Sequence, residues 1–423
     1  MNAELRHSEA PLANSEPSPR VHMVWTRGID GVPMVGRIKV AQGVRAAFRN
    51  AGFSVTESTL RPLTNVRSAR RLAAALGRLL GAMAKGRLVP LQCLLFGDPA
   101  EARRAIAEMP ADCDLVYLDG VRCLTLLEEL ARRPELPILT DFDDLMSRRM
   151  SLLLELGHAP STGYLKSSMP RFVERLIASP ALSRLLLRYE AASLRQVERR
   201  FAVHSDAMVL ISGEDAAVLR RLAPRAAVRA IPLAAQVRRT EGNLAVRPLR
   251  FIFVGTDALR QNQLTIDALI ELWRREQIAT PLVVYGEQHR APSLPPNVSM
   301  PGYAANLDDI YDGRSILLSP SYIAGGLKTK VIEAFAYGAP VLGNRVTFEG
   351  IEIRKDYPLL VANEAEMLPL IRDPERFRDR FERAAAMGLQ IVREHHDPVR
   401  VDKAWRETAV AAMGRRHVTK APF

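Results

Sequence analysis

Short buried runs of apolar residues alternate along the chain with longer segments in which apolar positions recur at helical spacing. At the N-terminal end, residues 21–26 predict a strand, residues 38–50 an amphipathic helix and residues 54–59 a second strand. Runs that predict further strands lie at 91–96, 115–118, 138–140, 207–211, 228–232, 250–255, 281–285, 316–318 and 339–342. Helical segments include 67–84, 99–109, 121–133, 182–201, 327–337, 364–372, 374–394 and 398–413. This alternation is typical of parallel sheets with helices on both faces, so we predict an α/β fold with two Rossmann-like, doubly wound domains.

Polar segments divide the chain of 423 residues into domains. Residues 1–20 carry proline, serine and charges without an apolar core, which indicates a disordered tail rather than a secretory signal. Residues 238–247 are polar and charged and include a glycine, which is typical of an interdomain linker. We therefore expect an N-terminal domain at 21–237, a C-terminal domain at 248–397 and a final segment, 398–423, with one more helix.

The most informative stretch is SPSYIAGGLKTKVIEAFAYGAPVL at 319–342. Gly325 and Gly326 allow a tight turn and a close backbone approach to a ligand, and a helix is predicted directly after them. The free N–H groups and the positive dipole end of such a helix favour a phosphate group. Its first turn adds two cations and a hydroxyl, those of Lys328, Thr329 and Lys330. The stretch therefore predicts an anion-binding site.

Glu333 belongs on the same face of this helix as Thr329 and Lys330, where the ribose hydroxyls of a bound nucleotide would lie. The Gly-Gly pair, the spacing of Lys330 from Glu333 and the following run AFAYGAPV resemble the donor site of bacterial nucleotide-sugar glycosyltransferases with the GT-B fold, the group 1 or family 4 class. The resemblance extends over residues 250–350. From the residues alone, an ordinary strand–loop–helix unit with solvated lysines remains the alternative.

The resemblance implies two Rossmann-like domains that face each other across a cleft, with the last helix bracing the N-terminal domain. It implies a nucleotide-sugar donor, transfer with retention to a hydroxyl of a glycan, lipid-linked or small-molecule acceptor, and no metal or separate cofactor. The implied donor-binding residues are Gly325, Gly326, Lys328, Thr329, Lys330, Glu333, Arg260 and Tyr303. Two features depart from the family. Gly325 stands where the first of two glutamates would be, and Arg260 lacks the lysine that usually accompanies it.

Further assignments keep an alternative open. Tyr303 either stacks on the nucleotide base or packs internally. The loop after the first strand, with Gly28, Gly31, Gly36 and Arg37, either holds the acceptor, as the resemblance implies, or is a plain turn. Asp119 ends the strand at 115–118 and is placed on the acceptor side, because ligands of parallel sheets bind beyond the carboxyl ends of the strands.

Three acidic residues follow the strand at 138–140, namely Asp141, Asp143 and Asp144. They can act on an acceptor hydroxyl, bind a divalent metal, or cap the next helix and pair with Arg148 and Arg149. The resembling family carries a His-Asp pair or an Asp-rich equivalent at this place beside the reacting sugar. The resemblance therefore implies a catalytic position for Asp143 and Asp144, with the other interpretations open.

Composition adds candidates for partners. The net charge of +12 fits an anionic substrate, an anionic lipid surface or nucleic acid, but no nucleic-acid motif is present, so we expect no nucleic-acid partner. The basic segment 150–201 either packs with a solvated face or lies on an anionic membrane. Three scattered cysteines and the lack of an apolar run of ~20 residues indicate a cytoplasmic protein, at most peripheral at the inner face of the membrane.

The predicted function is that of a glycosyltransferase in surface polysaccharide or glycoconjugate synthesis. A GT-B sugar epimerase or phosphorylase would use the same cleft, and a non-catalytic subunit that binds nucleotide sugars is the second alternative. Near the C-terminus, His395, His396 and Asp397 attract attention as metal ligands. The two histidines are adjacent rather than at helical metal spacing, so we expect a polar helix end instead.

Overall fold

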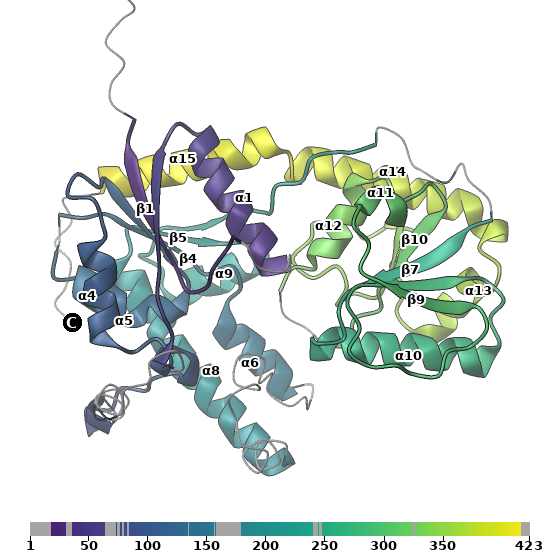
Figure 1. Cartoon of the computed structure of the whole chain (residues 1–423), viewed down its shortest axis with the longest axis horizontal. Helices are drawn as coiled ribbons and strands as arrows, with labels where there is room; N and C mark the ends of the chain where they lie inside the picture. The colour runs from purple at the N-terminus through teal and green to yellow at the C-terminus, as the bar shows by residue number, and fades with distance from the viewer. Residues whose placement is uncertain are drawn as a thin grey trace, which may run out of the picture.

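The computed structural model describes residues 18–30, 36–63, 84–133, 135–155, 179–239, 248–323 and 326–415, and a few isolated positions between these ranges. Two α/β domains lie side by side (Figure 1). Among the described residues each domain is built on one sheet, and every strand pair in both sheets is parallel. The predicted fold class is confirmed.

The N-terminal sheet has the strand order β2-β1-β3-β4-β5-β6. Its strands are β1 (Arg20–Trp25), β2 (Ser54–Thr59), β3 (Leu115–Asp119), β4 (Ile138–Asp141), β5 (Ala207–Leu210) and β6 (Val228–Ala230). Every residue of β3, β4 and β5 is buried, as expected for central strands of a sheet that is covered on both faces. Their continuous apolar runs explain why the sequence pattern located them well.

Helices cover this sheet, namely α1 (Gly36–Asn50), α3 (Leu91–Leu94), α4 (Pro99–Ala107), α5 (Leu124–Leu130), α6 (Met146–Glu155), α8 (Pro180–His204) and α9 (Gly213–Leu222). The strand predicted at 91–96 is wrong, because the helix α3 occupies its first four positions. A short apolar run does not distinguish a strand from a buried helical turn. Here Pro90 precedes the turn in an extended conformation, and Glu190 accepts a hydrogen bond from the N–H of Leu91. The helix predicted at 67–84 lies mostly outside the described residues.

The C-terminal sheet has the order β11-β10-β7-β8-β9. Its strands are β7 (Arg250–Val254), β8 (Leu282–Tyr285), β9 (Val298–Gly302), β10 (Ser315–Leu318) and β11 (Val341–Leu342), and its helices are α10 (Arg260–Glu276), α11 (Leu307–Ile310), α12 (Thr329–Ala336), α13 (Glu364–Arg372) and α14 (Arg378–His395). The apolar pattern did not reveal β9, because this edge strand buries only Val298.

Two stretches of chain connect the domains, and they are hydrogen-bonded to each other. The imidazole Nδ1–H of His396 donates to the carbonyl of Leu233 over 2.7 Å, and the N–H of Ala235 donates to the carbonyl of His396 over 2.8 Å. After the second crossing, α15 (Pro398–Gly414) packs against α1 on the N-terminal domain (Figure 1). Its Trp405 is 3% exposed and lies against the rings of Phe48 and Tyr117.

The parallel arrangement collects the loops that follow the strands at one edge of each sheet. Contacts between these loops, described below, join the N-terminal domain after β4 to the C-terminal domain after β10 and β11. The carboxyl edges of the two sheets therefore face each other, and the glycine-rich turn lies between them.

Candidate functional site

The glycine-rich turn leads directly into α12. Gly326 has φ +81°, a conformation that residues with a side chain rarely adopt, and Gly325 lies outside the described residues. Lys328 is the N-cap of α12, and no side chain caps the first turn. The first N–H groups of the helix are therefore not taken by a capping side chain, and they can bind an anion.

Lys328 points inward from this turn. Its ammonium donates to the carbonyl of Gly326 over 3.0 Å and lies 3.5 Å from the carboxylate of Glu349. Burial lowers the pKa of Lys328, although Glu349 opposes the effect. The side chain is buried, which excludes the solvated lysine of the ordinary strand–loop–helix interpretation.

Lys330 forms no ion pair with a carboxylate among the described residues. Its Nζ lies 3.8 Å from the centre of the Phe253 ring and donates to Oδ1 of Asn262 over 3.2 Å. Burial, and next the nearby charge of Lys328, lower the pKa of Lys330 to about 7. An ammonium in such a place gains strongly from an added anion, because the anion restores the favourable environment that water provided.

Glu333 reaches across to the other domain. Its carboxylate accepts a hydrogen bond from the ammonium of Lys39, which lies on α1. The starts of α1 and α12 also touch, since a Cβ placed on Gly36 would lie 3.1 Å from Oγ1 of Thr329. The structure therefore brings Gly36, predicted on the acceptor side, against the predicted donor-binding helix α12.

Arg37 and Asp119, both predicted on the acceptor side, form a buried ion pair in the N-terminal domain. Asp119 also accepts hydrogen bonds from the N–H and the hydroxyl of Thr26, at 3.0 and 2.7 Å. Burial alone would raise the pKa of Asp119, but Arg37 and Arg27 outweigh it and hold this pKa well below its usual value. With its carboxylate oxygens engaged in this way, Asp119 anchors the loop after β1 and is poorly placed to act as a base.

Asp141 and Asp143 lie on the other side of the same guanidinium, with carboxylate oxygens 3.8 and 3.4 Å from Arg37. Asp141 is buried, accepts a hydrogen bond from the hydroxyl of Tyr117 over 2.6 Å and has a pKa raised to about 6 by burial. Asp143 has φ +60°, an unusual conformation for a residue other than glycine, and its side chain is 23% exposed. Backbone strain of this kind is concentrated at functional sites.

Asp144 contacts the donor turn directly. A Cβ placed on Gly326 would lie 2.5 Å from the Oδ2 atom of Asp144, so only a glycine fits opposite this carboxylate. Burial, and next the charge of Asp143, raise the pKa of Asp144 to about 7, and Arg149 at 3.3 Å opposes this shift. The structure thus brings the predicted catalytic aspartate and the predicted donor turn together.

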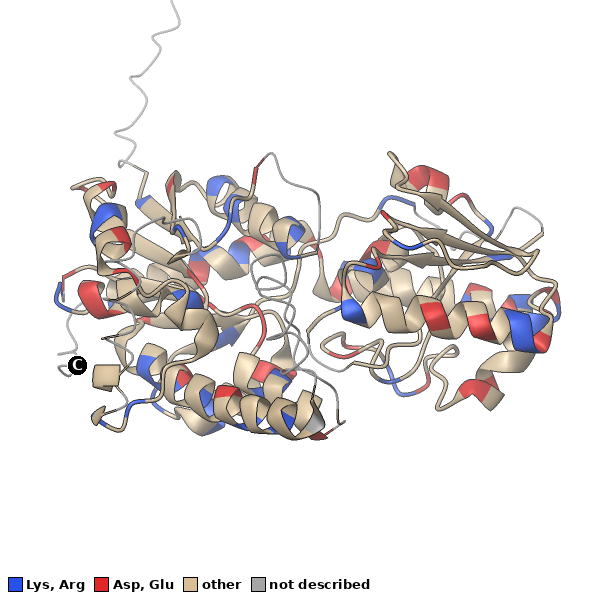
Figure 2. Ribbon diagram, turned by 60° about the horizontal axis from the view of Figure 1, so that its bottom comes forward, with Lys and Arg blue, Asp and Glu red and all other residues tan. Residues whose placement is uncertain are grey.

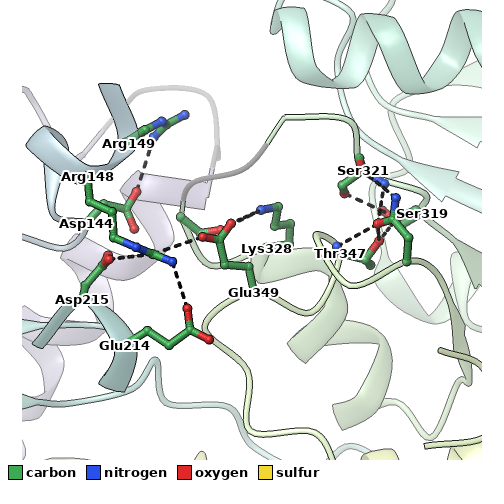
Figure 3. Close-up of polar contacts among 12 residues, drawn as sticks. Asp144, Arg148, Arg149, Glu214, Asp215, Ser319, Ser321, Lys328, Thr347 and Glu349 are labelled. Atoms are coloured by element: carbon green, nitrogen blue, oxygen red, sulfur yellow. Dashed lines mark hydrogen bonds and ion pairs between the residues drawn. The ribbon is translucent and has the colours of Figure 1, made fainter. Parts of the chain in front are cut away.

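An ion-pair network lies beside this contact (Figure 3). The guanidinium of Arg148 on α6 is 2.8 Å from Asp215 of its own domain and 3.1 Å from Glu349 of the other domain. Glu349 in turn faces Lys328. Each domain therefore contributes charges that hold the other close to the glycine-rich turn.

Two predicted donor residues are not part of this network. Arg260 is exposed and donates to Gln263 over 2.7 Å, and Tyr303 is 73% exposed at the end of β9. Among the described residues no cluster of His, Cys, Asp and Glu has the geometry of a metal site. Of the described helices, none is both long and apolar enough to span a bilayer.

Two residues of the site were not identified from the sequence. Lys39 was not predicted, because a lysine near the start of an amphipathic helix does not by itself indicate a binding site. Arg148 was considered only as a partner for the neighbouring aspartates, whereas it bonds Asp215 and Glu349, which are 67 and 201 positions further along the chain. Only the packing of the two domains reveals these partners.

Residues 248–384 match the family described as glycosyl transferases group 1. No curated protein sequence matches the chain.

Similar solved structures include sucrose-phosphate synthase from Thermosynechococcus elongatus, with a TM-score of 0.60 and 14% identity over 92% of this chain and 98% of that one. Another is HepE of Anabaena in complex with UDP-glucose, with a TM-score of 0.56 and 12% identity over 93% of this chain and 99% of that one. At such identities the likeness to solved structures establishes the fold alone. The chain thus has the two-domain GT-B fold, and residues 248–384 of its C-terminal domain match the group 1 glycosyltransferases in sequence.

Proposed function

We propose that the protein transfers a sugar from a nucleotide sugar to a hydroxyl group of an acceptor, in the crevice between its two domains. The observation that carries the proposal is the start of α12, which has no side-chain cap, contains the buried Lys330 and follows the turn at Gly326 that faces the carboxylate of Asp144. Such a helix start can bind the diphosphate of a donor, and a facing carboxylate can accept a proton from an acceptor hydroxyl.

On the donor side, the diphosphate would lie at the first turn of α12. The N–H groups of this turn, Lys328 and Lys330 would surround it with positive charge. As the bond to the sugar breaks, negative charge develops on the departing diphosphate, and fixed cations in a site without water stabilise that charge most strongly. Glu333 would accept hydrogen bonds from the ribose hydroxyls.

On the acceptor side, Asp143 and Asp144 would act on the attacking hydroxyl. Asp144 is the stronger candidate for proton transfer, since a carboxyl group with a pKa of about 7 can both accept and release a proton near neutral pH. Asp141 and Asp119 would keep the loops in position through Tyr117 and Arg37. We further propose transfer with retention, as the resemblance implies.

A uridine nucleotide is the first candidate for the donor, because HepE of Anabaena, which shares the fold, has been solved with UDP-glucose and with UDP. Thermal-shift and calorimetric titrations with UDP-, GDP- and ADP-sugars test the proposal, followed by assays for slow hydrolysis of the sugar that binds. Binding with turnover is the expected result. Binding to none of these sugars would overturn the proposal, and binding without turnover on any acceptor would favour a non-catalytic subunit.

We also propose a lipid-linked acceptor, in surface polysaccharide or glycoconjugate synthesis, taken from an anionic membrane. Acidic and basic residues are interspersed over both domains (Figure 2), so the net charge alone does not mark a membrane face. The exposed side of α8 differs, because Arg184, Arg188, Arg195 and Arg199 lie within about 60° of one another around the helix. Leu185 beside them is 64% exposed. A basic face with an exposed apolar residue favours anionic lipid.

Flotation with vesicles of phosphatidylglycerol, compared with phosphatidylcholine, tests the membrane proposal. The wild type should bind the acidic vesicles at low salt, and replacement of Arg184, Arg188 and Arg199 by glutamine should abolish binding. Replacement of the exposed Arg221, Arg225 and Arg406 by glutamine removes the same charge elsewhere and should leave binding intact. Equal binding by both triple variants would show that α8 is not the membrane face.

A further inference from the structure

The start of α1 presents a cation to the donor site from the opposite domain. Arg37 on this helix points into the buried carboxylates of its own domain, whereas Lys39 points outward and pairs with Glu333 of α12. The two helices touch at their first residues, as the contact between Gly36 and Thr329 shows. Two positive dipole ends therefore converge at one point, which is unfavourable unless negative charge lies between them.

The positive charge that the C-terminal domain offers to a diphosphate is limited. Lys328 is already engaged by Glu349 and by the carbonyl of Gly326. Lys330 must take up a proton to be fully charged in the complex, because its pKa in the free protein is about 7. Arg260 is exposed and bound to Gln263. A nucleotide sugar carries two negative charges on its diphosphate, so these residues leave it undercompensated.

We propose that Lys39 is a donor-binding residue contributed by the N-terminal domain, which exchanges its ion pair with Glu333 for contact with the diphosphate of the nucleotide sugar. The exchange frees the carboxylate of Glu333 for the ribose hydroxyls. Both new contacts are charge-assisted hydrogen bonds, so the single ion pair that is lost is replaced by two interactions of comparable strength. This inference rests on the proposed function.

Because Lys39 belongs to the N-terminal domain, it can contact the diphosphate only when both domains surround the donor. It also acts on the phosphates and not on the base. The diphosphate nucleotide should therefore bind more weakly when Lys39 is removed, whereas the nucleoside without phosphates should not lose affinity.

The test uses the full chain and whichever of UDP, GDP or ADP the wild type binds best, together with the matching nucleoside. Lys39→Met should weaken binding of the diphosphate about tenfold, which is the loss of about one charge-assisted hydrogen bond, and should not weaken binding of the nucleoside. Lys39→Arg should recover most of the affinity. The exposed Lys403 on α15 provides the control, since Lys403→Met removes the same charge and should bind as the wild type does.

A double-mutant cycle with Glu333→Gln separates phosphate binding from mere positioning of Glu333. If Lys39 contacts the diphosphate, Lys39→Met still weakens binding about tenfold when Glu333 is already glutamine. No further loss in that background would overturn the inference and leave the proposed function intact. If the wild type binds none of the three diphosphates, both the inference and the proposed function fail. Thermal unfolding curves confirm that each variant is folded.

Discussion

The lowered pKa of Lys330 predicts how donor binding depends on pH. Between pH 7 and 9, the charged fraction of a lysine with a pKa of about 7 falls from about one half to about one hundredth. If the diphosphate binds only the charged form, its association constant falls about fiftyfold over this interval, and binding takes up close to one proton at the upper end. Calorimetry in two buffers with different ionisation enthalpies measures both quantities.

Asp144 ionises over the same interval, with a pKa of about 7, and its negative charge would also weaken binding of an anion. The Asp144→Asn background removes this contribution and isolates Lys330. In that background, Lys330→Met should lower affinity at pH 7 and abolish the remaining pH dependence. An affinity that stays constant from pH 7 to 9 in the Asp144→Asn protein would refute the assignment of Lys330 to the diphosphate.

Lys330→Met should also change the stability of the fold, in the direction opposite to its effect on donor binding. A lysine whose pKa is lower in the folded protein than in the unfolded chain disfavours folding, because the unfolded chain binds the proton more readily. Lys330→Met should therefore raise Tm at neutral pH while it weakens donor binding. A residue kept at such a cost to stability is typical of a functional site. A lower Tm would indicate that the contact with Phe253 stabilises the fold instead.

Three further predictions concern the crevice and its supports. Gly326→Ala places a Cβ at φ +81° against Asp144, so it should lower the unfolding free energy by about 1–2 kcal/mol, measured by denaturation. The same variant should bind the donor more weakly in calorimetry, and an unchanged affinity would mean that the turn does not contact the donor. Arg148→Met removes the ion pair that joins α6 to Glu349 of the other domain, so small-angle scattering should show a larger radius of gyration, whereas Arg132→Met, at an exposed pair, should not change it. Trp405→Ala should cost about 3–5 kcal/mol in chemical denaturation, and a loss below 1 kcal/mol would contradict the bracing role of α15.

Much of the fold could be predicted from the sequence, because buried parallel strands leave continuous apolar runs. The buried strands β3, β4 and β5 lie within one residue of their predicted limits. The failures occur where burial is partial or ambiguous. The edge strand β9 buries one residue, and the apolar run at 91–96 folds as the helix α3.

Part of the candidate site could be predicted from the sequence, and part could not. The segment around Gly326 and Lys330 is local in sequence, so its composition alone suggested an anion site. The partners of Glu333 and Glu349 come from the opposite domain, 294 and 201 positions away, and no local pattern encodes such a pairing. The directions in which the lysine side chains point could not be predicted from the sequence either, because they depend on which carboxylates and rings surround these side chains after folding.

The bonds between Leu233, Ala235 and His396 restrict how the two domains can move. The two connecting segments are hydrogen-bonded to each other at one place, so they act as a single hinge axis. The domains can rotate about this axis more easily than they can slide past each other. In such a swing, points distant from the axis separate most and points near it hardly move. Entry of a substrate and departure of a product would then require only a change of angle, after which the same atoms return to register.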